Sequence, residues 1–475
     1  MPGSWRNARA DKPRQTATKR RRHTLLDVTS GRSVSSGRAG ACCISPPIRH
    51  CGGRDEAHSV TRREDYSAVG VSVEAPPAAT RHVLFLNWRD TRNPEGGGSE
   101  VYVERIAGEL VRRGHRATLL CATHSAGPAE EVTAAGVRVL RRGGRHTVYL
   151  RAALVYLAGA LGLGPLTRRR GGRPDVIVDV GNGLPFLSAL YARRPVIALV
   201  HHVHREQWPV VLGRWLARFG WWVESWLAPR VYRHCQYVTV SAATRQELAT
   251  LGIDPSRVAI VHNGTPDMTV GPVPRTPHPS LVVLGRLVPH KQVELALHAV
   301  AGLTDELPGL TLVVAGQGWW EPELRQLAEE LGVTDRVRFT GFISDAEKRE
   351  LLASAWLALT PSLKEGWGLT IVEAGAVGTP TVAFRGAGGV EEALVDGRTG
   401  LLADGVDDFV AKVRLLLTDD GRRTAMGAAA RAHAARFTWP VSGEKFAALV
   451  TRAANVRAVV PAEQLEPVEP SYLVP

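Results

Sequence analysis

The chain of 475 residues has little cysteine, little lysine and no long apolar run. Its five cysteines include no Cys-x-x-Cys pair, which argues against a disulfide framework and against a cysteine zinc site. The stretch 152–166 is uncharged but has only 15 residues, fewer than the roughly 20 that span a bilayer. With 44% hydrophobic and 22% charged residues, the chain is expected to fold around a sizeable core in a reducing, cytoplasmic environment.

An excess of one charge is concentrated at the N-terminus. Residues 1–80 hold 14 Arg or Lys and 7 Asp or Glu, a surplus of +7 (14 − 7), so the other 395 residues carry +6 of the net +13 (13 − 7). This mildly basic remainder does not require a nucleic-acid partner. Because residues 1–80 lack apolar periodicity, we predict a disordered basic tail, with an arm for nucleic acid or a membrane as the alternative.

Order is predicted to begin at the apolar run 82–87, which is typical of a buried parallel strand. A glycine loop, a helix over 99–113 and a strand over 117–122 follow, and together they form a βαβ unit. The remaining predicted strands fall in two series around a Pro- and Gly-rich linker at 264–280: 175–179, 196–200, 237–240 and 258–261, then 281–284, 311–315, 337–339, 357–359 and 381–383.

This alternation predicts an α/β protein with two doubly wound Rossmann-like domains that face a central cleft. The expected parts are a tail (1–80), an acceptor-side domain (81–268), a nucleotide-sugar domain (269–437) and a returning helix with a tail (438–475). Such pairs bind ligands in the cleft, at the carboxyl ends of the strands.

Residues 208–233 interleave tryptophan with arginine. Indoles sit well at headgroup depth and arginines meet anionic lipid, so the segment suits a membrane surface. The alternative is a pair of helices that pack on the domain core and carry arginines at their rim. The apolar stretch 149–166 is a second candidate for such contact.

The most specific stretch runs from Glu365 to Glu373 and places two carboxylates eight residues apart around a glycine loop. The loop leads into a helix near Leu369, whose free N–H groups and positive dipole end suit a phosphate. The carboxylates suit sugar hydroxyls. Alone, the pattern also fits a surface turn before a helix whose acidic residue complements the dipole.

Two cations, Arg286 and Lys291, follow the first strand of the second domain. At the carboxyl end of a strand they can neutralise a departing diphosphate as a glycosidic bond breaks. The alternative is that both are solvated loop charges.

With these motifs the chain resembles the retaining nucleotide-sugar glycosyltransferases of the GT-B fold, family four (glycosyl transferases group 1). Residues 365–373 match the E-x7-E motif, and Gly285, Arg286 and Lys291 match the G-R…K donor motif. The resemblance extends from about residue 82 to about 450, and its shorter matches lie at 261–264, 316–318, 337–342, 388–392 and 400–402.

The resemblance implies a role for each matched residue. Arg286 and Lys291 would bind the donor diphosphate, Glu373 the ribose and Glu365 the hydroxyls of the transferred sugar. The other donor-binding positions that it implies are Gly97, Gly98, Gly285, Gly316, Phe342, Ile343, Gly366, Gly368, Leu369 and Thr370. Among these, the segment with Phe342 and Ile343 would contact the base, and the glycine triplet leaves the correspondence of Gly97 and Gly98 uncertain by one position.

The family also has a histidine after a strand of the first domain. Here the strand 196–200 precedes His201, His202 and His204. His201 is the first candidate and His204 the second, either one to bond a sugar hydroxyl or polarise the reacting centre, while at least one of the three packs in the core. Asn182, His202 and His204 are the acceptor-side candidates.

Retaining transfer in this family resembles front-side displacement, so Glu365 and Glu373 are expected to bind ligand rather than act as the acid and base of a hydrolase. We expect no metal and no cofactor, a UDP- or GDP-sugar donor, and a glycan or lipid-linked acceptor of the cell envelope. Contact with the cytosolic membrane face follows from the aromatic segment. Replacing Glu373 or Lys291 with alanine is predicted to abolish transfer and leave folding intact.

The main alternative to a retaining glycosyltransferase is a GT-B nucleotide-sugar epimerase or a non-catalytic nucleotide-binding protein. A pyridoxal-phosphate phosphorylase would need a cofactor lysine, for which the sequence offers no distinct candidate. A dehydrogenase is disfavoured because the loop after Asn87 lacks Gly-x-Gly-x-x-Gly.

Overall fold

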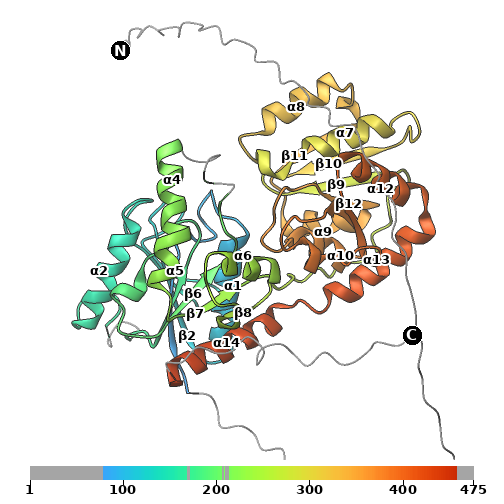
Figure 1. The fold of residues 1–475 in the computed structure, drawn as a ribbon. Helices are drawn as coiled ribbons and strands as arrows, with labels where there is room; N and C mark the ends of the chain where they lie inside the picture. The colour runs from blue at the N-terminus through green and yellow to red at the C-terminus, as the bar shows by residue number, and fades with distance from the viewer. Residues whose placement is uncertain (1–78, 168–171, 206–207, 209–212, 457–475) are drawn as a thin grey trace, which may run out of the picture. The chain divides into compact units, whose positions relative to one another are not determined.

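The computed structural model describes residues 79–167, 172–205, 208 and 213–456 (Figure 1). These residues form two parallel sheets, each covered by helices, so the prediction of two doubly wound α/β domains is confirmed. We call the domains the N-lobe and the C-lobe. Almost all of the predicted tail, and the chain after residue 456, lie outside the described residues.

The N-lobe sheet has eight strands in the order β3-β4-β2-β1-β5-β6-β7-β8, and only β3 is antiparallel to its neighbour. Its central strands are buried along their length, as in a sheet with helices on both faces. Its elements are β1 (His82–Leu86), α1 (Gly98–Arg112), β2 (Arg116–Cys121), β3 (Glu130–Val132), β4 (Arg138–Arg141), α2 (Val148–Ala160), β5 (Val176–Val180), η2 (Ser188–Leu190), β6 (Val196–Val200), α4 (Arg214–Trp222), η3 (Val223–Leu227), α5 (Ala228–Val231), β7 (Gln236–Thr239), α6 (Ala242–Thr250), η4 (Pro255–Arg257) and β8 (Val258–Ile260).

The C-lobe sheet has six parallel strands in the order β11-β10-β9-β12-β13-β14. The order reverses beside β9, where the crevice of an open α/β sheet forms. Its elements, with the closing helix, are β9 (Ser280–Leu284), η5 (Pro289–Lys291), α7 (Glu294–Leu303), β10 (Thr311–Ala315), α8 (Glu321–Glu330), η6 (Thr334–Arg336), β11 (Val337–Gly341), α9 (Asp345–Ser354), β12 (Leu357–Thr360), α10 (Leu369–Ala376), β13 (Thr381–Phe384), α11 (Val390–Ala393), β14 (Gly400–Ala403), α12 (Val406–Thr418), α13 (Asp420–Ala434) and α14 (Trp439–Val456).

The chain passes between the lobes twice, and the two passages touch. Thr265 pairs with Thr438, and Ser442 Oγ donates to the His262 carbonyl at 2.7 Å. Beyond this point α14 packs on α1, with the Phe446 ring stacked 6.1 Å from Phe85 of β1. The last helix of the described chain is therefore part of the N-lobe core.

Three strands, β3, β4 and β14, are absent from the predicted set. β3 carries Glu130 and Glu131, so it offers no apolar run that would indicate a strand. β4 ends in Arg141, whose buried guanidinium donates through Nε to Asp90 Oδ2 at 2.7 Å. A pairing over 51 positions cannot be seen in local sequence.

The aromatic segment forms a helix with an exposed apolar face. Trp215 of α4 is 83% exposed, and Phe219, Trp222 and Trp226 follow at helical spacing with 43–54% of each residue exposed. Arg218 lies over Trp215 and Arg230 over Trp226. No helix within the described ranges is both long and apolar enough to cross a membrane.

Candidate functional site

Two glycines bring the carboxyl ends of β9 and β10 together. At Gly316, which has a φ of +144°, a Cβ would lie 1.8 Å from the Gly285 carbonyl oxygen, so no larger residue fits there. This close approach fixes the backbone directly after β9, where the next residue is Arg286. The Arg286 side chain is exposed, and no carboxylate of the described chain pairs with it.

Arg286 and Lys291 line a small hollow, open to solvent, at the ends of β9 and β12. Lys291 closes η5 and lies 2.5 Å from Glu365 Oε1, which also accepts from Ser362 Oγ at 2.7 Å. Burial opposes ionisation of Glu365, but the Lys291 charge and these hydrogen bonds outweigh it and lower the pKa of Glu365. The site therefore joins two cations with one ionised carboxylate.

His290 lies between Arg286 and Lys291 in the sequence and adds no third positive charge. Burial and the charges of Lys291 and Arg286 lower the pKa of His290 to about 4. Its imidazole is neutral at physiological pH.

The helix α10 begins at Leu369, directly after Gly368 in the left-handed conformation (φ +93°). Its first turn, with Leu369 and Thr370, presents free backbone N–H groups on the same loop that carries Glu365 and Gly366. Gly368 is buried between Ile371 and Ala393, so the loop is packed against its own helix.

Glu373 lies in the second turn of α10 and pairs with Lys348 of α9 at 2.7 Å. Burial raises the pKa of Glu373, and the Lys348 charge offsets only part of that effect. Burial would lower the pKa of Lys348, but Glu373 and Asp345 together raise it. Lys348 could not be identified from the sequence. Its pairing with Glu373 joins two helices and spans 25 positions, so no local pattern indicates it.

The predicted base contacts lie at the end of β11. Phe342 is 80% exposed and Ile343 is half-buried. An exposed aromatic ring at a strand end offers a stacking face to a base.

In the N-lobe, Glu100 holds the glycine loop in place. Glu100 is fully buried and accepts from the Gly97 N–H at 2.7 Å and from Asn182 Nδ2 at 3.0 Å. Arg89 Nε donates to the same carboxylate at 3.3 Å. The structure therefore joins the loop of Gly97 and Gly98 to the predicted acceptor-side residue Asn182.

Neither Glu100 nor Arg89 was identified from the sequence. Glu100 stands at the third position of α1, a place typical of a capping carboxylate, and this was the available signal. Arg89 is buried, and the charge of Arg286 from the other lobe adds to burial in lowering its pKa. Arg89 and Arg286 thus contribute positive charge to one region of the molecule.

The segment after β6 lies against the loop of the C-lobe that carries Glu365. At Gly366 a Cβ would lie 2.9 Å from the His201 carbonyl oxygen and 3.7 Å from His202 Nδ1, which leaves room only for glycine. Lys364 Nζ donates to the Val203 carbonyl at 3.2 Å. These contacts bring His201 and His202 to the predicted donor loop.

The three histidines differ in their surroundings. His201 is buried edge-to-face on Tyr102, and burial lowers its pKa to about 3, so its ring is neutral. Its Nε2 is one of the buried polar atoms of the described chain that lack a hydrogen bond. His204 Nδ1 is bound to Glu224 Oε1 at 2.9 Å, and its ring lies 4.1 Å from that of His202. His204 therefore serves to fix this segment, and His202 is nearer to the donor loop.

The ion pairs revise one expectation. Removing Lys291 leaves Glu365, whose side chain is only 16% exposed, without its cation. We therefore expect the Lys291→Ala variant to lose stability as well as activity.

Among the described residues, no group of three or more histidine, cysteine, aspartate or glutamate side chains is arranged to hold a metal ion. Arg286 and Lys291 supply the positive charge at the hollow, and Arg89 supplies it beside the glycine loop.

Two domain families match the chain, one in each lobe. Residues 97–264 match the glycosyl transferase 4-like domain, and residues 272–433 match glycosyl transferases group 1. Each lobe thus resembles a glycosyltransferase domain, and the two lobes together have the GT-B fold.

Solved GT-B structures share this architecture. Sucrose-phosphate synthase from Thermosynechococcus elongatus aligns with a TM-score of 0.64 at 17% identity, over 78% of this chain and 98% of that one. Anabaena HepE in complex with UDP-glucose aligns with a TM-score of 0.62 at 20% identity, over 78% of this chain and 99% of that one. At these identities the likeness concerns the fold.

Sequence relatives of the GT-B chain include D-inositol 3-phosphate glycosyltransferases. That of Streptomyces bingchenggensis is 35% identical over 210 residues, 40% of this chain and 46% of the relative. That of Corynebacterium efficiens is 34% identical over 237 residues, 44% of this chain and 55% of the relative. The matches span about half the length of these relatives.

Proposed function

We propose that this chain is a retaining hexosyltransferase that moves a sugar from a UDP- or GDP-sugar to an acceptor hydroxyl, without a metal or other cofactor. The observation that carries the proposal is the hollow at the ends of β9 and β12, where the Lys291–Glu365 pair lies beside Arg286. A diphosphate needs the cations and a sugar needs the carboxylate. The structure of HepE with UDP-glucose and the names of the sequence relatives support this choice.

In the proposed site, cationic groups bind the diphosphate of the donor and carboxylates bind its hydroxyl groups. Arg286, Lys291 and the first turn of α10 take the diphosphate, while Glu365 and Glu373 take the hydroxyls of the sugar and the ribose. The acceptor oxygen attacks the anomeric carbon on the face from which the diphosphate leaves. The bond from that carbon to the phosphate oxygen breaks, and the acceptor proton passes to the released phosphate. Neutral His201 contributes at most a hydrogen bond here.

Donor hydrolysis tests the proposal without knowledge of the acceptor. We expect UDP-glucose, UDP-N-acetylglucosamine or GDP-mannose to raise the melting temperature and to be hydrolysed slowly. Proton NMR during the first turnover should show the α-anomer from the α-linked donor. First release of the β-anomer would contradict retention. An epimeric sugar would point to an epimerase, and binding without sugar release would point to a non-catalytic protein.

The acceptor is proposed to be lipid-linked or membrane-proximal, as in cell-envelope polysaccharide synthesis. Support comes from the exposed face of α4 and η3, where Trp215, Phe219, Trp222 and Trp226 are accompanied outward by arginine. The acidic residue of this stretch, Glu224, is directed inward and bound by His204 and Trp208. An apolar face with positive charge alone suits the cytosolic face of an anionic membrane.

Vesicle sedimentation tests this contact. The full chain is expected to bind vesicles of phosphatidylglycerol and phosphatidylcholine, and the variant Trp215→Ser, Phe219→Ser, Trp222→Ser is expected to lose about tenfold or more of that binding. Trp319→Ser is the matched control, because Trp319 is 62% exposed on the C-lobe. Equal sedimentation of all three proteins, or equal binding to phosphatidylcholine alone, would contradict the proposal.

A further inference from the structure

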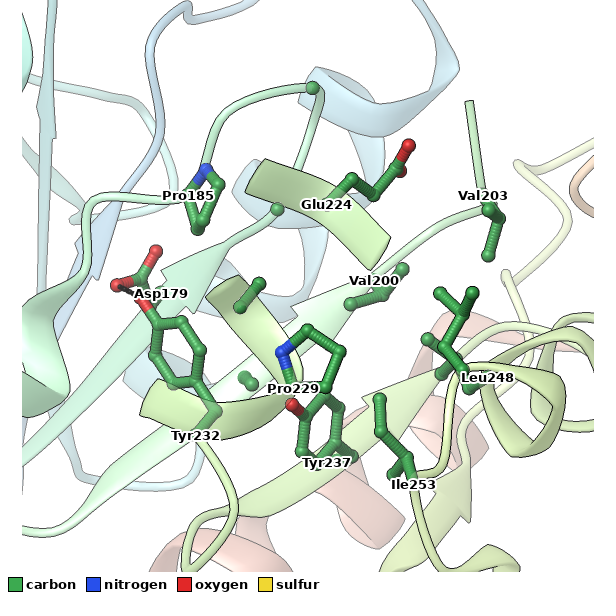
Figure 2. A pocket seen from close by; sticks show the side chains of 15 residues that line it. Asp179, Pro185, Val200, Val203, Glu224, Pro229, Tyr232, Tyr237, Leu248 and Ile253 are labelled. Carbon is green, nitrogen blue, oxygen red and sulfur yellow. Dashed lines mark hydrogen bonds between the residues drawn. The ribbon is translucent and has the colours of Figure 1, made fainter. Parts of the chain in front are cut away.

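A second pocket lies in the N-lobe, between the ends of β5 and β6 and the helical stretch η3–α5 (Figure 2), and its empty space, the solvent at its open mouth included, comes to about 490 Å³. Its wall is mostly aliphatic, with Val200, Val203, Leu248 and Ile253 on one side and Pro229 on the other, and Ala228 also lines it. None of these residues belongs to the donor site. The pocket has no role in the function proposed so far.

The charged residues at this pocket are already satisfied within the protein. Asp179 accepts from Ser188 Oγ at 2.6 Å, from the Phe186 N–H at 3.0 Å and from the Tyr232 hydroxyl. Glu224 accepts from Trp208 Nε1 at 2.8 Å and from the His204 N–H at 3.0 Å. Neither the Asp179 carboxylate nor the Glu224 carboxylate is therefore free to bind a ligand. The remaining wall is apolar and favours a hydrocarbon.

One polar atom in the wall is different. The Tyr237 hydroxyl is buried and has no hydrogen-bond partner in the described chain. A buried hydroxyl without a partner is costly, and a single polar group on an otherwise apolar ligand would satisfy it.

The pocket adjoins both the proposed acceptor site and the proposed membrane face. Gly181 and Gly183 line it, and Asn182 between them bonds to Glu100 at the glycine loop. Val200 and Val203 line it, and His201 and His202 between them face Gly366. On the outer side, η3 and α5 supply Glu224, Ala228 and Pro229 to the wall, while Trp226 and Arg230 of the same stretch lie exposed.

We propose that this pocket holds the hydrocarbon chain of a lipid-linked acceptor, next to its head group. The inference rests on the proposed function and names the substrate class of the same site. A chain that leaves the bilayer at the aromatic face would enter between η3–α5 and the sheet. Its head group would then lie at Asn182 and His202, beside the donor loop.

Calorimetry with farnesyl phosphate below its micelle concentration tests the pocket, and inorganic phosphate serves as the head group alone. We expect farnesyl phosphate to bind and phosphate not to bind measurably. Ala228→Phe, which places a ring in the pocket, should weaken farnesyl phosphate binding by about tenfold or more. Ala249→Phe is the matched control, because Ala249 lies on α6 between the lining residues Leu248 and Leu251 but is not part of the wall.

Tyr237→Phe keeps the shape of the wall and removes only the unpaired hydroxyl. It should fold at least as stably as the wild type and bind farnesyl phosphate at least as tightly, because the hydrocarbon chain of this probe offers the hydroxyl no partner. If Ala228→Phe does not fold, Leu251→Trp fills the pocket from the residue that follows α6 and is expected to have the same effect.

Equal farnesyl phosphate affinity in the wild type and the filled variants would overturn the inference, as would phosphate binding as tightly as farnesyl phosphate. UDP and GDP binding is measured on the same proteins and should be unchanged. Nucleotide binding without farnesyl phosphate binding leaves the proposed function standing and refutes the pocket. Farnesyl phosphate binding without any nucleotide binding or donor hydrolysis refutes the proposed function instead.

Discussion

Sugar transfer by the Lys291→Ala variant is expected to fall by about 10²–10³-fold, a loss comparable to removal of one preorganised electrostatic contact to a transition state. In the proposed site the Lys291 ammonium meets the negative charge that accumulates on the departing diphosphate, and Arg286 remains as the other cation of the hollow. The same change should reduce the free energy of unfolding by about 2–3 kcal/mol, because Glu365 stays largely buried without its cation. Steady-state kinetics and urea unfolding measure the two effects.

A second replacement separates the two losses. In the double variant Lys291→Met, Glu365→Gln no buried charge is left alone, so stability should return toward that of the wild type while transfer stays low. Arg414→Ala is the control, because Arg414 pairs with Glu306 at 3.0 Å and about half of each side chain is exposed. It should cost about 0.5 kcal/mol and leave transfer unchanged. Full transfer by Lys291→Ala would remove Lys291 from the donor site.

The fold could be predicted from sequence because a parallel strand between helices is a short apolar run that needs no partner to be seen. The runs at 82–87, 281–284 and 311–315 correspond to β1, β9 and β10 within one or two residues. β3 and β4 were missed because charged residues make up much of them. Their place in the sheet depends on contacts with residues far along the chain, such as that of Arg141 with Asp90.

The candidate site likewise has parts that local sequence indicates and parts that depend on remote contacts. The loop and helix that carry Glu365 and Glu373 follow from glycines and spacing, which are local. The cations that hold those carboxylates are remote: Lys291 lies 74 positions from Glu365, and Lys348 lies 25 positions from Glu373. Motif reasoning supplied Lys291 and could not supply Lys348.

The apolar pocket had no local signal either. Its wall combines residues of β5, β6, α5 and α6 with Tyr237 of β7, each of which looks like ordinary core in the sequence. The helix beside it widens to a π-helix over Val223–Leu227, a local departure that periodicity does not reveal.

At Glu373 we expect a loss confined to the ribose of the nucleotide. Glu373→Gln keeps the shape of α10 but weakens the acceptor for a diol, so affinity for UDP, or for GDP if that is the nucleotide bound, should fall by about 10–100-fold. The 2′,3′-dideoxy nucleotide should bind the wild type with a similar loss and bind the variant with little further loss. Glu321→Gln on α8, where Glu321 pairs with Arg325, is the matched control and should change neither affinity.

The pH dependence of this affinity tests the role of Lys348 as a positioning residue. Burial raises the pKa of Glu373, and Lys348 opposes that effect, so acidification protonates Glu373 and weakens its acceptance of the diol. Without the cation, in Lys348→Met, the pKa of Glu373 rises further, and the affinity should begin to fall at a higher pH than in the wild type. In Glu373→Gln this pH dependence should disappear, because no carboxyl titrates there. Identical pH profiles for all three proteins would mean that Glu373 does not touch the nucleotide and that its pair with Lys348 only holds α9 against α10.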